Sequence, residues 1–285
     1  MRDVFVTGAS GNVGRAVIAA LESRGARFRI GDRRPAGLMP FPNCDVVEFN
    51  FLDAATYGPA VAGCNTVFLL RPPAISNTGD TLNRFIDVAR AAGVDHIVFV
   101  SVVGAGSNPL VPHHAVEHHL RHGPPGWTIL RPGFFAQNLE STYRRDIQND
   151  DRIYVPAGRG KVAFIDTRDL ANVAVQALLD PLRHAGQAYT LTGPVALSFA
   201  EVADLLSSEL KRTVRYTPAS TMGYIRHLLD AGTPLIQALV QSALHVGLRF
   251  GQAERVDPTL GRLMDRPALT MAQYVHDRRT LWMAR

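Results

Sequence analysis

Short apolar segments of strand length alternate with longer segments of helical periodicity over the first half of the chain. The strand-like segments are residues 4–6, 28–30, 46–49, 66–70, 96–100 and 127–130. The clearest helical segments between them are residues 81–92 and 113–121. This alternation predicts a doubly wound α/β fold, in which helices cover both faces of a parallel sheet. In such sheets, ligands bind at the carboxyl ends of the strands.

The pattern changes after residue 140. Residues 166–179 and 198–210 predict helices, and Ser198 followed three residues later by Glu201 predicts a capping box at the start of the second. Residues 218–250 are helical and mixed in polarity, which fits either a lobe that covers a substrate pocket or a plain pair of core helices. We expect a core over residues 1–140, with the remaining sheet elements and a smaller, mainly helical lobe over residues 141–285, in one compact unit.

A glycine-rich turn follows the first strand-like segment and precedes a helical one. Residues 7–14 read Thr-Gly-Ala-Ser-Gly-Asn-Val-Gly, and strand, glycine turn and helix in this order are typical of a dinucleotide-binding turn. Gly8 and Gly11 allow the backbone to turn sharply and to approach a pyrophosphate, and Gly14 allows the helix to pack close to the sheet. The free N–H groups at the start of that helix favour phosphate oxygens. The sequence therefore predicts a Rossmann-like nucleotide site here.

The end of the second strand-like segment gives two conflicting indications about the cofactor. Asp32 lies 18 positions after Gly14, near the spacing at which an acidic residue accepts a hydrogen bond from the adenine ribose of NAD. Arg33 and Arg34 follow it directly, and guanidinium groups match the geometry of a ribose 2′-phosphate. We expect NADP(H) to be preferred, while NAD(H) stays possible.

Composition narrows the class of protein. The 285 residues carry a net charge of +5 without a basic run that could follow a nucleic acid backbone, so no nucleic acid partner is expected. Cys44 and Cys64 share no metal or redox spacing and predict no disulfide framework. Neither a signal peptide nor a membrane-spanning segment is predicted, and we expect a cytoplasmic protein; the sequence does not indicate its oligomeric state.

The ordered set of motifs resembles the NmrA-like family of atypical short-chain dehydrogenase/reductases over nearly the whole chain. These motifs are the glycine turn, Asp32-Arg33-Arg34-Pro35, residues 49–53, residues 67–73, the stretch Trp127 to Asn138, residues 164–169, residues 190–194, and the tail from Gly261 to Val275. Members of the family include NAD(P)H-dependent quinone and ketone reductases. Others are cofactor-binding regulators that perform no chemistry.

The resemblance implies a set of cofactor contacts in this chain. The pyrophosphate would lie on Gly8, Ser10, Gly11, Asn12 and Val13, and the 2′-phosphate on Arg33, with Arg34 as a second candidate beside Asp32. Phe51 and Leu52 would flank the adenine, Leu70 and Arg71 the adjoining ribose, and Pro132, Gly133 and Phe134 the nicotinamide end. Asn50 stands where the family pattern has an acidic residue, which leaves its adenine contact open.

The chain departs from the family of short-chain reductases in its catalytic residues. Ser101 ends a strand-like segment, where the catalytic serine is expected, but no tyrosine lies between Tyr57 and Tyr143. Only two lysines occur, at positions 161 and 211, so the usual Tyr-x-x-x-Lys motif is absent. Counting from Ser101 places His114 at the tyrosine position, whereas counting back from Glu117 places His113 at a position often held by lysine. Both histidines are candidate proton donors, and both also fit a surface or helix-cap role.

The same histidine-rich segment could suggest a metal site, because His114 and His118 are four residues apart. No third ligand can be identified in the sequence, and we expect no metal.

The missing tyrosine and lysine suggest that the substrate assists its own protonation. The cofactor supplies the hydride. A quinone, or an aromatic ketone that is hydrogen-bonded to its own phenol, then forms a stabilised alkoxide. The strong bias towards arginine fits a high-GC genome, in which aromatic polyketide ketoreductases of antibiotic biosynthesis occur.

We therefore expect an NAD(P)H-dependent reductase of a ring ketone or quinone carbonyl in a small aromatic substrate. A catalytically inactive, NAD(P)-binding redox sensor is the alternative, and an isomerase or dehydratase on the same fold is a third class.

Overall fold

The computed structural model describes residues 3–35, 44–124 and 126–283. The chain forms two compact units, Met1–Pro132 with Thr167–Leu191, and Gly133–Asp166 with Thr192–Arg285. Each unit therefore consists of two separate stretches of sequence. The last two helices and the last strand of the first unit come from residues that follow the first segment of the second unit.

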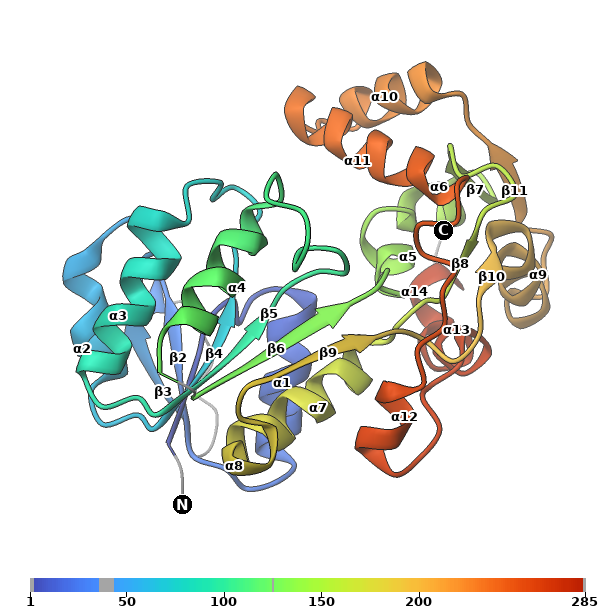
Figure 1. Ribbon diagram of the computed structural model, residues 1–285. Coiled ribbons are helices and arrows are strands. Elements are labelled where there is room, and N and C mark those ends of the chain that lie inside the picture. Colours follow the sequence, from blue (N-terminus) through green and yellow to red (C-terminus); the bar gives the residue numbers. More distant parts are fainter. Residues whose placement is uncertain (1–2, 36–43, 125, 284–285) are drawn as a thin grey trace. The chain divides into compact units, whose positions relative to one another are not determined.

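The first unit is built on a seven-stranded parallel sheet (Figure 1). Its strands are β1 (Val4–Val6), β2 (Phe28–Asp32), β3 (Cys44–Glu48), β4 (Thr66–Leu70), β5 (His96–Val100), β6 (Trp127–Pro132) and β9 (Gln187–Leu191). They lie in the order β3-β2-β1-β4-β5-β6-β9. The order reverses beside β1, and this switch point is where ligands bind in doubly wound sheets. The predicted fold class is confirmed.

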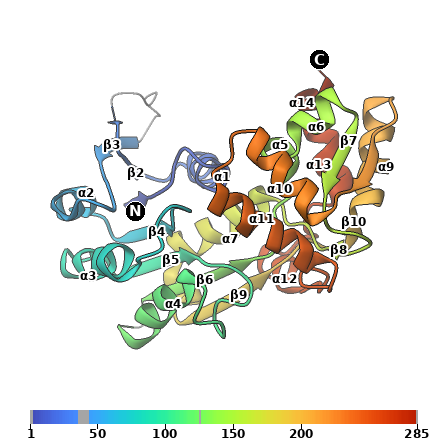
Figure 2. The ribbon, with the colours of Figure 1, turned by 90° about the horizontal axis from the view of Figure 1, so that it is seen from above.

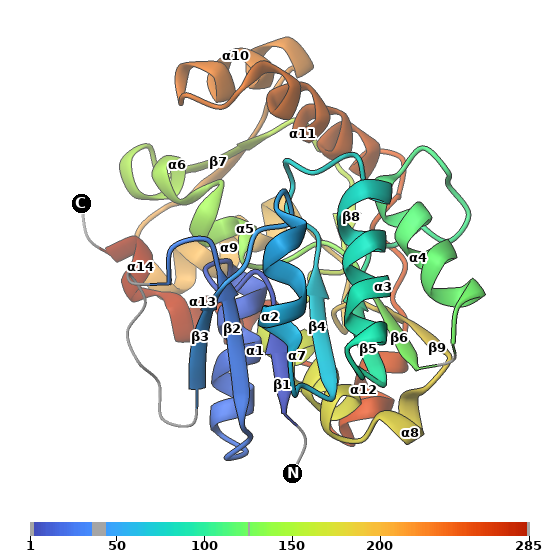
Figure 3. The same ribbon diagram turned by 90° about the vertical axis from the view of Figure 1, so that its left-hand side faces the viewer.

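Helices cover both faces of this sheet (Figures 1 and 3). One face carries α2 (Tyr57–Val61), α3 (Arg84–Ala91) and α4 (Pro112–His122), with the π-helical turn η3 (Gly79–Asn83) leading into α3. The other carries α1 (Asn12–Glu22) packed along α7 (Thr167–Leu179), followed by the short α8 (Pro181–His184). Aromatic rings fill the core beneath α2 and α3, where the Phe49 and Phe85 ring centroids are 5.0 Å apart.

The second unit is mainly helical. Its helices are α5 (Asn138–Ser141), α6 (Arg144–Asn149), α9 (Phe199–Leu210), α10 (Thr221–Asp230), α11 (Leu235–Leu248), α12 (Thr259–Met264), α13 (Met271–Arg278) and α14 (Thr280–Met283). Two small sheets join them, the antiparallel pair β8 (Lys161–Val162) with β10 (Leu197–Ser198) and the parallel pair β7 (Arg152–Val155) with β11 (Arg215–Pro218). The predicted capping box of Ser198 and Glu201 opens α9.

Helices α10 and α11 lie side by side (Figure 2). Each presents one face to the core of the second unit, where Tyr224, Leu228 and His245 are buried. The opposite face of α11 exposes Leu235, Ile236 and further aliphatic side chains. Over the described ranges, the helices are too short or too polar for any of them to cross a membrane.

Candidate active site

The turn between β1 and α1 requires glycine at two positions for internal reasons. Gly8 has a φ of +70°, and a Cβ there would lie 2.8 Å from Cδ2 of Leu70. At Gly14, a Cβ would lie only 2.1 Å from the carbonyl oxygen of Gly8. These two glycines let β1, α1 and the end of β4 approach one another.

Gly11 is different, because nothing in the protein prevents a side chain there. A Cβ would meet the Gly8 carbonyl oxygen at 3.5 Å, an ordinary contact, and the φ of −81° suits any residue. Gly11 and Ser10 are exposed. The fold itself does not need a glycine at position 11. The lack of a side chain at Gly11 instead leaves space for a ligand to approach the backbone closely.

The first turn of α1 has free hydrogen-bond donors. Its N-cap, Gly11, provides no side-chain cap, and the first intrahelical bond runs from the Arg15 amide to the Gly11 carbonyl. The amides of Asn12 and Val13 precede that bond, so the start of the helix presents donors and the positive end of its dipole. The geometry suits a phosphate group.

Thr7 fixes this turn to the neighbouring strand. Its hydroxyl donates to the carbonyl oxygen of Phe68 at 3.1 Å and accepts from the amide of Leu70 at 2.9 Å. The side chain is fully buried between β1 and β4. Sequence reasoning assigned no role to Thr7, since a threonine after a strand is not distinctive.

The end of β2 presents the predicted selectivity residues. The backbone amide of Arg34 donates to Oδ1 of Asp32 at 2.8 Å, which leaves the second carboxylate oxygen to other partners. Both Arg33 and Arg34 are exposed. The roles of these three residues towards the ribose stay predictions.

The two residues predicted to flank the adenine differ in exposure. Phe51 is only 7% exposed, and its ring lies edge-on to Phe49 with centroids 4.8 Å apart. Leu52 is 77% exposed, and its amide donates to Oδ1 of Asn50 at 3.0 Å. Leu52 therefore presents its side chain to solvent, while Phe51 belongs largely to the core.

Arg71, at the end of β4, is held by several acceptors. Its Nε donates to Nε2 of His113 at 3.3 Å, and its Nη1 donates to the carbonyl oxygens of Pro72 and Ile75. These bonds hold the loop after β4 around the guanidinium group. The second terminal nitrogen, Nη2, has no hydrogen bond within the described residues and is the donor left for a ligand.

His113 is a neutral imidazole. Burial and the nearby Arg71 cation lower its pKa to about 4. Since Nε2 accepts from Arg71, the proton belongs on Nδ1, which is buried without a partner. The ring packs against Phe99. A neutral histidine in this setting is a weak proton donor near neutral pH.

His114 has a different environment, although it is the adjacent residue. Its Nδ1 lies 2.8 Å from the carbonyl oxygen of Ala105, to which it donates. This bond fixes the tautomer and leaves Nε2 as the ring nitrogen that could meet a substrate. His118 stacks on His122 one turn further along α4, with ring centroids 3.9 Å apart. Among the described residues, no three potential metal ligands form a group.

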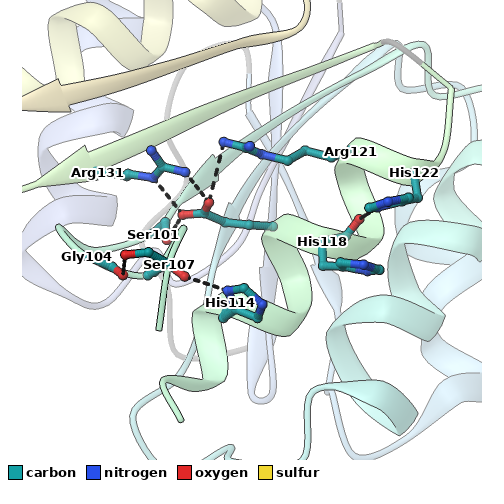
Figure 4. Close-up of polar contacts among 10 residues, drawn as sticks. Ser101, Gly104, Ser107, His114, His118, Arg121, His122 and Arg131 are labelled. Atoms are coloured by element: carbon teal, nitrogen blue, oxygen red, sulfur yellow. Dashed lines mark hydrogen bonds and ion pairs between the residues drawn. The ribbon is translucent and has the colours of Figure 1, made fainter. Parts of the chain in front are cut away.

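Ser101 forms no hydrogen bond with His113 or His114, and instead joins a buried ionic network (Figure 4). Its hydroxyl donates to Oε1 of Glu117 at 2.6 Å. Arg131 binds both oxygens of the same carboxylate, with Nε 2.9 Å from Oε1, and Arg121 adds an ion pair at 3.8 Å. Burial opposes the ionisation of Glu117, but the hydrogen bonds from Arg131 and Ser101 outweigh it and lower the pKa of this carboxyl.

In the sequence, Glu117 served only as the residue from which the position of His113 was counted. The side chain is 2% exposed, and Ser101 is 1% exposed, so both belong to the interior of the first unit. A lone glutamate between buried Val116 and Leu120 was the available signal, since an acidic residue on the apolar face of a helix needs a partner.

The second unit contains a buried tyrosine–histidine pair that the sequence did not reveal. The Tyr143 hydroxyl donates to Nε2 of His245, whose Nδ1 donates to the Gln241 carbonyl oxygen at 2.7 Å. Burial raises the pKa of Tyr143 and lowers the pKa of His245. The pair fastens α11 to the start of α6.

Phe134, predicted to lie at the nicotinamide end, packs inside the second unit. Its ring is edge-on to those of Phe164 and His245, with centroids 5.7 and 5.6 Å away. Its carbonyl oxygen accepts from the Ile165 amide at 2.9 Å. Gly133 precedes it at the start of this unit, directly after Pro132 of β6.

The chain is similar to a known protein family and to a known enzyme. A family described as NAD(P)H-binding matches residues 8–181. The NAD(P)H azoreductase of Xenophilus azovorans is 31% identical over 95% of this chain and 96% of its own length.

Two solved structures are similar in fold. The NADPH-dependent quinone oxidoreductase QOR2 of Escherichia coli, complexed with NADPH, has a TM-score of 0.85, with 24% identity over 96% of this chain and 99% of that chain. NmrA, a negative transcriptional regulator in complex with NAD, has a TM-score of 0.72, with 19% identity over 97% of this chain and 94% of that chain.

Proposed function

This chain belongs to the NAD(P)H-binding family and is an NAD(P)H-dependent oxidoreductase, and we propose that it reduces a quinone or ring ketone carbonyl in a small aromatic molecule, with NADPH as the preferred donor. The expected cofactor class is confirmed at the level of NAD(P)H, and the resemblance to NmrA is confirmed for the fold. The substrate and the preference for NADPH are the proposal.

The observation that carries the cofactor part of this function is the open position at Gly11 in an otherwise closed turn. Gly8 and Gly14 are needed by the fold, whereas Gly11 leaves room beside the free amides of α1. Such room is needed by a pyrophosphate on the backbone. Ser10, Asn12 and Val13 would complete this contact.

The cofactor, when bound, supplies a hydride to the substrate carbonyl. The residues of this chain would orient it. Arg33 and Arg34 would bind the 2′-phosphate, Leu52 would cover the adenine, and Nη2 of Arg71 would reach the adjoining ribose. The backbone from Pro132 to Phe134 would bind the nicotinamide end.

The environments of the candidate proton donors favour a substrate that needs little help. The Ser101 hydroxyl is bonded to Glu117, and His113 is neutral with its pKa near 4. His114 donates its Nδ1–H to Ala105, so its available Nε2 carries a proton only in the imidazolium form, and we propose that form as a weak donor. Reduction of a quinone gives an oxyanion whose charge is delocalised over the ring. Reduction of a ketone that is hydrogen-bonded to a phenol of the same molecule gives an oxyanion stabilised by that hydrogen bond. Both depend less on an external acid.

Similar proteins support an aromatic substrate class. The relative from Xenophilus azovorans is an azoreductase, and the similar structure from Escherichia coli is a quinone oxidoreductase. Azo compounds and quinones are both planar conjugated acceptors of reducing equivalents. A tailoring role on polyketides in antibiotic biosynthesis would be a narrower version of the same proposal.

The test is NADPH oxidation, followed by nicotinamide absorbance, against a panel of quinones, aromatic ketones and azo compounds, with NADH in parallel. Consumption that depends on the quinone or ketone, and is faster with NADPH, is the expected result. Tight NADPH binding without consumption across the panel would contradict the proposal and indicate a cofactor-binding regulator. The lack of a Tyr–Lys pair is the observation that favours this second candidate.

A further inference from the structure

A pocket with a volume of about 340 Å³ lies entirely within the second unit. Its walls come from α9, from the start of α13, from the loop that precedes β10, and from Phe164 just after β8. These elements gather around β8 and β10 in Figure 1, and α9 contacts both α13 and β10. Phe134, which we place at the nicotinamide end, does not line the pocket.

The walls are mainly apolar. Of these lining residues, Phe164 and Met271 are buried, Leu197 and Leu205 are half-buried, and Val195 is 53% exposed. A volume of this size falls in the range of small-molecule sites, which are typically apolar with a few polar groups that fix orientation. The pocket could therefore bury an aromatic or short aliphatic body.

Two carboxylates are the charged groups that line the pocket. Glu201 and Asp204 lie three positions apart on α9, and both are exposed. Neither forms an ion pair within the ranges that the structure describes. Lys161 is the nearby cation that acts on Glu201 electrostatically.

The hydrogen bonds of Glu201 leave part of its carboxylate available. Its Oε2 accepts from the amide and the hydroxyl of Ser198, and these bonds lower the pKa of Glu201. Its Oε1 has no hydrogen bond within the described residues. Thr270, the other polar side chain of the lining, is engaged in its own capping box with Gln273. The charge of the side chains that line the pocket is therefore negative, with Lys161 acting on Glu201 from nearby.

We propose that this pocket binds an apolar organic cation, with its hydrocarbon body against Met271 and Leu205 and its ammonium group beside Asp204 and Glu201. Charge complementarity selects the cation, since an anion of the same shape would be repelled and a neutral one would leave the carboxylates unused. This pocket is independent of the hydride-transfer proposal, because none of the described residues of the first unit lines it.

The test compares three isosteric probes by isothermal titration calorimetry on the full chain: naphthylethylamine, naphthylethanol and naphthylacetate. We expect the amine to bind at least ~10-fold more tightly than the acetate, with the alcohol between them. Asp204→Asn and Glu201→Gln should each weaken the amine by ~3–10-fold and leave the alcohol unchanged. Glutamine at position 201 retains the acceptor that the capping box needs.

Ala272→Trp locates the site, because Ala272 is exposed at the pocket and an indole there would fill it. It should abolish binding of both amine and alcohol, while Asp230→Asn, at an exposed acid of α10, should change neither. Circular dichroism checks that each variant is folded. Equal affinity for amine and acetate, amine binding that survives Ala272→Trp, competition by NADPH, or no amine binding at millimolar concentration would each overturn the proposal.

Discussion

The hydroxyl of Ser101 donates to the carboxylate of Glu117 at 2.6 Å, within a network that also includes Arg131. Glu117→Gln would remove the negative charge and leave Arg131, which is largely buried, without its counterion. We expect a loss of about 3–5 kcal/mol in the free energy of unfolding, as for other broken buried pairs. Urea unfolding measures this loss, with Glu48→Gln at an exposed site of β3 as the control. Equal stability of both variants would mean that the network contributes little.

Gly11→Ala separates ligand binding from folding. The new methyl group meets no close atom of the protein, so the free energy of unfolding should stay within about 0.5 kcal/mol of the original. It would stand where we expect the pyrophosphate, and NADPH binding should weaken by at least ~10-fold. Gly14→Ala should instead destabilise the protein, since its Cβ would lie 2.1 Å from a backbone oxygen. If the Gly11→Ala variant bound NADPH with unchanged affinity, the pyrophosphate would not bind at this turn.

Arg33→Ala should weaken NADPH binding more than NADH binding. A lost charge-assisted contact with the 2′-phosphate corresponds to about 1–3 kcal/mol, and NADH lacks that phosphate. Fluorescence titration with both cofactors measures the difference, and Arg27→Ala at an exposed position after α1 serves as the control. An equal loss for both cofactors would show that Arg33 does not recognise the 2′-phosphate.

Single alanine variants of Ser101, His113 and His114 test whether the substrate assists its own protonation. We expect each to lower kcat by less than ~100-fold, with the largest effect at His114, because a dedicated acid contributes about 10²–10⁴-fold. His118→Ala, one turn along α4, is the matched control. A greater loss at any one position would identify a dedicated donor and exclude full assistance.

The Tyr143–His245 pair predicts a pH dependence of stability. Burial lowers the pKa of His245 in the folded protein, so the unfolded chain binds more protons at mildly acidic pH. The contribution of His245 is therefore present above its unfolded pKa of about 6.5 and is lost as the pH falls towards the folded value. His245→Gln should flatten the change in Tm between about pH 7 and pH 5. A variant with the same slope as the original protein would contradict this assignment.

The sequence predicted the elements whose side chains follow a regular period. All six expected strands of the parallel sheet are present, and the expected helix over residues 198–210 begins at its capping box. Further sheet elements were expected after residue 140, but the sequence did not locate strand β9, because Gln187–Leu191 mixes polar and apolar residues at the edge of the sheet. Local patterns specify local structure, and an edge strand carries a weaker pattern than a buried one.

Contacts between side chains that are far apart in the chain could not be predicted from the sequence. Tyr143 and His245 are 102 positions apart, and no periodicity relates them. The Ser101–Glu117–Arg131 network also depends on the packing of α4 against β5 and β6. Spacing identified His113 and His114 as candidates, but only their surroundings show that one is a neutral partner of Arg71 and the other keeps a free nitrogen.

The division of both units into separate stretches of sequence has a consequence for how the protein is made. A chain that ended near residue 140 would lack α7, which packs on α1 and on strands β4 to β6, and would lack β9, which pairs with β6. Its sheet would emerge with one apolar face covered by α1 alone and with β6 as an open edge, a condition that favours aggregation. The nucleotide-binding unit therefore cannot mature ahead of residues 133–166 during synthesis, and its folding must wait for its neighbour's first segment to be translated.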